Sequence, residues 1–168
     1  AATAADAGLD VVIVERKDEE EAGHIACGDA LKGADKFPES IPKSELDSAF
    51  TNTGVDHGRF EIPSHDTVLE IPIPGELAVI DRWEYGRNVI AGAERRGVEF
   101  HYDTVVQDVT QTDDGRVTGV RATRKGEVVE YDAEVTIDAA GALSILQDKA
   151  DLADATFDTN VSFSQFCS

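Results

Sequence analysis

The sequence is poor in cysteine, in basic residues and in long apolar runs, and each shortage excludes a class of protein. Two cysteines, Cys27 and Cys167, with no CxxC pair, exclude a disulfide framework and favour a reducing cytoplasm. No apolar run approaches the length needed to cross a bilayer. Lysine and arginine together number 15 against 34 acids, for a formal net charge of −19. A field of that sign repels nucleic acid.

The acidic residues are spread along the chain, and lysines number only six. This pattern is typical of a halophilic protein, kept soluble in a salt-rich cytoplasm where ions screen the self-repulsion. The alternative is an acidic cation binder, but the sequence contains no D-x-D-x-D-G loop. We therefore predict no metal site. At 168 residues the chain can bury one sizeable core.

The predicted fold is organised around Leu9 to Arg16, which reads LDVVIVER. Its β-branched run predicts a strand buried on both faces of a parallel sheet, after a helix over 1–7 that ends at Gly8. A strand that ends in an acid, here Glu15, is typical of the second half of a βαβ dinucleotide unit, where the acid binds the adenosine ribose. The first strand and its glycine-rich turn are absent, so we expect the amino end to be missing. Any α/β domain with a buried strand ending in Glu is an equal alternative.

Cys27 and Gly28 follow an acidic loop, and the spacing of apolar residues predicts a helix over 29–37. A loop that enters a helix offers free backbone N–H groups and lowers the pKa of a thiol. This junction is therefore a candidate for contact with an electron-rich ring. The alternative reading of Cys27, which spacing alone favours, is a small buried hydrophobe.

A second candidate site follows the short apolar strand predicted over 77–80. Asp81 and Glu84 have the spacing of a capping box, so a helix begins at Arg82, buries Trp83 and ends near Gly97. With a strand over 98–102, this span predicts a second βαβ crossover. Arg82 then lies at the sheet edge where α/β folds bind ligands. The alternative is a solvent-facing arginine, which the helix dipole disfavours.

Three β-rich runs follow, over 104–110, 116–123 and 127–131, and two tight turns join them into a meander. Residues 134–138 form another β-branched run and predict a further strand. The small residues after it, 139–144, suit close approach to a diphosphate, although an ordinary strand-to-helix turn is the alternative.

In this order, VVIVER, HIACGDAL, AVIDRWEYGRNVIAGAERRGVEF, TVVQDV and TIDAAGALS resemble the geranylgeranyl reductase family of flavoproteins, and most closely the archaeal digeranylgeranylglycerophospholipid reductases. The most specific part of the resemblance is the Cys27-Gly28 pair, which follows a short loop after Glu15, the acid expected to bind the ribose. The resemblance implies an α/β fold, a FAD-binding Rossmann-like domain of the glutathione-reductase type with an inserted β-meander. Residues 1–155 would form this partial domain, with an insertion over about 38–76 and the meander over about 103–131. Residues 156–168 would begin a substrate domain.

The resemblance also implies the cofactor FAD and the residues that bind it: Glu15 on the ribose, Cys27, Gly28 and Ala30 along the isoalloxazine, Arg82 on the flavin, and the backbone of Val106 on the adenine. Cys27 is the catalytic candidate, nearest the reactive edge of the ring. Ala140 departs from the family, because its Asp-Gly motif has Asp there.

The implied function is saturation of isoprenoid double bonds in membrane lipid precursors by hydride transfer from reduced flavin. The implied electron donor is NAD(P)H or ferredoxin, and the partners are the isoprenoid lipid and, peripherally, the inner face of the cell membrane. The fragment alone is expected to be inactive. The alternatives are a FAD-dependent aromatic monooxygenase and a non-enzymatic acidic nucleotide-binding module.

Overall fold

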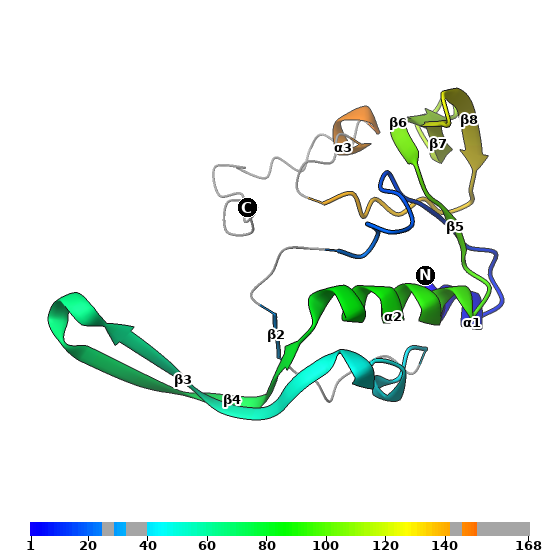
Figure 1. The fold of residues 1–168 in the computed structure, drawn as a ribbon. Coiled ribbons are helices and arrows are strands. Elements are labelled where there is room, and N and C mark those ends of the chain that lie inside the picture. The colour runs from blue at the N-terminus through cyan, green and yellow to red at the C-terminus, as the bar shows by residue number, and fades with distance from the viewer. Residues whose placement is uncertain (25–28, 33–39, 142–145, 151–168) are drawn as a thin grey trace. The chain divides into compact units, whose positions relative to one another are not determined.

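A computed structural model describes residues 1–24, 29–32, 40–141 and 146–150 (Figure 1). The chain divides into two compact units, residues 1–13 with 22–99 and residues 14–21 with 100–168. The division passes through β1 (Val12–Val14) and β5 (Glu99–His101), which are neighbours in a two-stranded sheet. The prediction that the first strand is buried on both faces is wrong, because Val12 is 46% exposed and has only one neighbouring strand among the described residues.

The first unit combines a long β-hairpin with a helix. Its elements, in chain order, are α1 (Ala2–Asp6), β2 (Ala30–Lys32), the 3-10 turns η1 (Lys43–Glu45) and η2 (Asp47–Ala49), β3 (Phe50–Ile62), the 3-10 turn η3 (Pro63–His65), β4 (Thr67–Ile80) and α2 (Arg82–Glu94). Strands β3 and β4 pair antiparallel along their length. In Figure 1 the far half of this hairpin projects beyond α2.

The predicted helix over 29–37 is wrong at its start, because Ala30–Lys32 is strand β2 and pairs antiparallel with the end of β4. Asp29 has a positive φ of 55°, which prevents a regular helix from starting there. The backbone N–H and C=O groups along the edge of β4 form hydrogen bonds with this three-residue segment, and these bonds outweigh its weak preference for a helix. Residues 33–37 lie outside the described part of the chain.

Helix α2 begins and ends as the sequence predicts. The Asp81 carboxylate accepts a hydrogen bond from the backbone N–H of Glu84 at 2.9 Å, and Gly97 turns the chain with φ of 86°. The capping box forms only in half, because the Glu84 side chain accepts from the Ser48 hydroxyl at 2.8 Å instead. Trp83 is not on the buried face as predicted, since it is 40% exposed.

The core of the first unit lies between α2 and the chain before β3. It contains Ile41, Leu46, Ala49, Ala78, Ile80, Ala93 and Val98, each less than 9% exposed. The second βαβ crossover is a wrong prediction. Strand β4 belongs to an antiparallel sheet of order β2-β4-β3, whereas β5 pairs with β1. The apolar pattern of 77–80 suits either kind of sheet, and only its partners decide.

The second unit contains the predicted meander, which is confirmed. Strands β6 (Thr104–Gln111), β7 (Val117–Arg124) and β8 (Glu127–Asp132) form an antiparallel sheet in sequence order. Lys125 and Gly126 both have positive φ, 52° and 84°, as a two-residue hairpin turn requires. A short helix, α3 (Leu146–Lys149), follows.

Residues 134–138 do not form the predicted strand. The segment is irregular, and Val135 and Ile137 are 76% and 81% exposed. A strand exists only within a ladder, and no described segment pairs with this one. In the described part of the chain, no helix has the length and apolar character needed to cross a membrane.

Candidate functional site

Glu15 is held firmly in the second unit, at the carboxyl end of β1. Its backbone N–H donates to the His101 carbonyl at 2.9 Å, and its carbonyl accepts from the Thr104 N–H at 2.9 Å. One carboxylate oxygen, Oε1, accepts from the Lys17 N–H at 2.8 Å. Among the described residues the other oxygen has no hydrogen-bond partner. A half-buried carboxylate with one fixed and one free oxygen is suited to accept a hydrogen bond from a hydroxyl group.

Val106 lies in the same unit as Glu15 and is linked to it through Thr104. Thr104 is 1% exposed, and its hydroxyl donates to the Tyr102 carbonyl at 2.8 Å, so the start of β6 is fixed against the loop after Glu15. Val106 pairs with Ala122, and the ladder then shifts register before Asp108. A bulge leaves backbone groups outside the ladder. Glu15 and Val106 therefore belong to the same unit, and the hydrogen bond between Glu15 and Thr104 joins the segments that carry them.

Arg82 is the first residue of α2, in the first unit. Its guanidinium lies 5.1 Å from the centroid of the Tyr85 ring, and its Nε is buried without a hydrogen-bond partner. Among the described residues it forms no ion pair. A buried N–H normally finds an acceptor, because an unsatisfied one costs about 1–3 kcal/mol. Arg82 therefore offers a cationic donor to an oxygen-rich ligand.

The segment that leads to Cys27 is packed tightly on α2. Ala22 is 3% exposed, and a Cβ added to Gly86 would meet the Gly23 carbonyl oxygen at 2.2 Å. The next residue, His24, has its ring 4.7 Å from that of Trp83, in an edge-on arrangement. The two glycines therefore let a loop and a helix touch backbone to backbone.

The remaining predicted site residues are located only in part. Cys27 and Gly28 lie outside the described residues. Ala30 is described, as the first residue of β2 opposite Val79, and it is exposed. Ala30 and Arg82 belong to the first unit, and Glu15 and Val106 to the second.

Thr104, Gly23 and Gly86 were not predicted from the sequence. Gly86 carries a signal that could have identified it. A glycine inside a helix costs about 1 kcal/mol relative to alanine, so its presence in α2 indicates a close approach of another segment. Thr104 carries no such signal, because its burial depends on the loop after Glu15.

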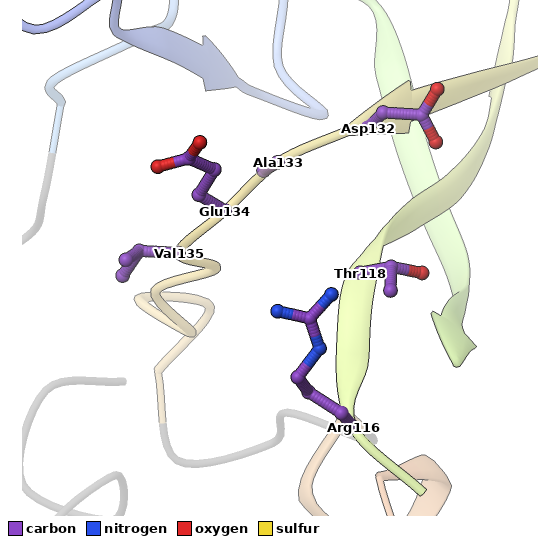
Figure 2. A pocket seen from close by; sticks show the side chains of 6 residues that line it. All are labelled: Arg116, Thr118, Asp132, Ala133, Glu134 and Val135. Carbon is purple, nitrogen blue, oxygen red and sulfur yellow. The ribbon is translucent and has the colours of Figure 1, made fainter. Parts of the chain in front are cut away.

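A separate hollow lies on the second unit (Figure 2). Its volume is about 680 Å³, and it is lined by Arg116, Thr118, Asp132, Ala133, Glu134 and Val135. None of the predicted site residues lines it. Figure 2 shows the Arg116 guanidinium directed toward the segment from Ala133 to Val135, while the Glu134 carboxylate points away. Its lining residues are exposed or half-buried, so the hollow has no dry interior in which polar contacts would be strong.

Comparisons with known proteins agree on one class. A family model described as "FAD dependent oxidoreductase" matches residues 72–159. The chain is 30% identical over 146 residues to digeranylgeranylglycerophospholipid reductase from Methanothrix thermoacetophila, covering 84% of this chain and 35% of the relative.

Two solved structures share the fold. A geranylgeranyl bacteriochlorophyll reductase-like protein from Thermoplasma acidophilum superposes with a TM-score of 0.71 at 21% identity, over 90% of this chain and 38% of that one. The myxobacterial chondrochloren halogenase CndH gives 0.72 at 18% identity, over 88% and 35%. The chain therefore spans little more than a third of the length of these relatives.

Proposed function

Because this chain belongs to the family of FAD-dependent oxidoreductases, we propose that the protein saturates isoprenoid double bonds in membrane lipid precursors. The chain has the mixed α/β, Rossmann-like fold of that family. The observation that carries the proposal is the 30% identity with a digeranylgeranylglycerophospholipid reductase over 146 residues. The order of motifs in the sequence points to the same family.

Three residues, each considered by itself, have a chemistry that suits a group of FAD. The free carboxylate oxygen of Glu15 suits a ribose hydroxyl, which a carboxylate binds strongly. The backbone released near Val106 by the register shift suits the polar edge of an adenine. The unpartnered Nε of Arg82 suits an oxygen of the flavin or its diphosphate.

When bound and reduced, FAD supplies the hydride for this class of reaction. The chain itself must then orient the alkene, exclude water and provide a proton to the second carbon. Cys27 is our candidate for the group nearest the reacting carbon, on the resemblance alone. A thiol is a reasonable proton donor because its ordinary pKa lies near 8.5, close enough to neutral pH to give up a proton and regain it.

The test uses the full-length protein, without oxygen, with chemically reduced FAD and a geranylgeranyl lipid dispersed in detergent. We expect a product heavier by two hydrogen atoms for each double bond reduced, measured by mass spectrometry. A matched lipid with saturated chains is the control and should not change in mass. Flavin reoxidation without any change in lipid mass would contradict the proposal.

A FAD-dependent monooxygenase is the second candidate, because halogenases and a probable FAD-dependent monooxygenase share the fold. It predicts oxygen consumption with NAD(P)H and an aromatic substrate, and no reaction in the anaerobic assay. A colourless full-length protein that binds a nucleotide without turnover would instead favour a non-enzymatic module.

A further inference from the structure

Arg82, at the start of α2, lies against the aromatic ring of Tyr85. Its guanidinium carbon is 5.1 Å from the centroid of that ring, which is within the range of a cation–π contact. Residues three positions apart lie on the same side of a helix, so α2 itself brings the two side chains together. Both residues are half-buried, and water therefore screens the contact only in part.

The acids beside Arg82 do not neutralise it. The Asp81 carboxylate accepts from the Glu84 backbone N–H at 2.9 Å, and the Glu84 carboxylate accepts from the Ser48 hydroxyl at 2.8 Å. Among the described residues no carboxylate forms an ion pair with Arg82, although the sequence has 34 acids against 15 bases. The positive end of the helix dipole also repels a cation here. The contact with Tyr85 is what offsets that repulsion.

A ring holds a cation in a way that a carboxylate does not. A carboxylate accepts hydrogen bonds from the guanidinium N–H groups and cancels the charge. A ring attracts the guanidinium through the negative face of its π-system, without accepting a conventional hydrogen bond. The buried Nε of Arg82 has no hydrogen-bond partner, and both this donor and the charge remain available to a ligand oxygen.

We propose that Tyr85 is a positioning residue, whose ring holds the Arg82 guanidinium in place for an oxygen of the bound flavin cofactor. The proposal rests on the proposed function, because it takes FAD as the ligand of Arg82. In this role the ring acts through Arg82 alone. It fixes the arginine before the cofactor arrives, so less side-chain freedom is lost when FAD binds.

The test is a double-mutant cycle in the full-length protein, with the affinity for FAD measured by fluorescence titration of the FAD-free form. Tyr85→Leu removes the ring, and we expect it to weaken FAD binding about fivefold, as the loss of a half-buried cation–π contact should. Tyr85→Phe keeps the ring and removes only the hydroxyl, so its affinity should stay within about twofold of that of the unaltered protein. In the Arg82→Met background, Tyr85→Leu should change the affinity less than about twofold, because the cation is already gone.

Circular dichroism confirms that each FAD-free variant folds, and Tyr85→Met replaces Tyr85→Leu if that variant unfolds. Equal losses from Tyr85→Leu with and without Arg82 would overturn the proposal, because Tyr85 would then support the fold and not the arginine. A loss from Tyr85→Phe as large as that from Tyr85→Leu would also overturn it, since the hydroxyl would then be the important group. The affinity for FAD is measured without lipid. The expected coupling without any lipid reduction would therefore contradict the proposed reductase activity and support this role of Tyr85.

Discussion

Replacing Gly86 by alanine should separate the loop before Cys27 from helix α2. The new Cβ would lie 2.2 Å from the Gly23 carbonyl oxygen and 2.8 Å from its carbonyl carbon. Ordinary contact begins at 3.4 Å, so the two segments must move apart by more than about 1 Å, a large displacement in a close-packed region. Both are backbone, and no rotation of a side chain can relieve the clash.

The magnitude follows from two opposing effects. Alanine in place of glycine inside a helix stabilises it by about 1 kcal/mol. Forcing an extra carbon into a packed site costs about 1–3 kcal/mol, and a clash with backbone lies at the upper end or beyond. We expect a net loss of about 2 kcal/mol in the free energy of unfolding, which lowers Tm by about 4–8 °C in a protein of this size.

Gly92 provides the control within the same helix. Its added Cβ would meet the Glu45 carboxylate at 3.3 Å and the Ile41 Cγ2 at 3.4 Å, and both are side-chain atoms. Gly92→Ala gains the same helix propensity with little clash, so Tm should rise by up to about 4 °C. Both variants are compared by thermal unfolding followed by far-ultraviolet circular dichroism. A Gly86→Ala variant as stable as Gly92→Ala would refute the close approach of Gly23 to α2.

Three further predictions address the cofactor, the ion pairs and the candidate proton donor. Arg82→Met removes a buried, unpartnered N–H, so it should weaken FAD binding at least about tenfold without lowering the Tm of the FAD-free protein. Fluorescence titration measures the affinity for FAD, and a loss of Tm in the FAD-free variant would contradict the reasoning. Arg96 and Arg95 lower the pKa of Glu45 from 4.5 to about 2, so its ion pairs stabilise the fold above pH 4.5 and are lost as the pH falls toward 2. Glu45→Gln should therefore lower Tm near neutral pH by a few degrees and by much less near pH 3, and an unchanged difference would count against this assignment. Cys27→Ala should slow lipid reduction at least about tenfold if its thiol donates the proton, whereas equal rates with bound flavin would remove it from the mechanism.

The parts of the fold that could be predicted are those determined by neighbouring residues. Asp81 caps α2 through the N–H of a residue three positions later, and the two turns of the meander depend on Gly115 and Gly126, which both have positive φ. Such interactions involve residues a few positions apart, so both partners can be recognised within one short stretch of sequence. The β-rich runs of the meander were informative for the same reason, because each strand pairs with the next along the chain.

Several of the wrong predictions concern segments whose structure depends on distant partners. Ala30–Lys32 is a strand because β4, some 45 positions later, offers it hydrogen bonds. Residues 134–138 have the composition of a buried strand, yet Val135 and Ile137 are exposed where no described strand pairs with them. A short apolar segment is compatible with several structures, and long-range pairing selects among them.

The first turns of α2 show where the sequence departs from what favours a stable helix. Arg82 places a positive charge at the positive end of the helix dipole, and its Nε is buried without a partner. Gly86, one turn later, lowers helix propensity and admits the backbone of Gly23. Two unfavourable residues four positions apart lie on the same side of a helix. Violations of local rules that coincide in space are typical of functional sites. The start of α2 is therefore where a bound cofactor should most increase the stability of the first unit, which hydrogen exchange with and without FAD can measure residue by residue.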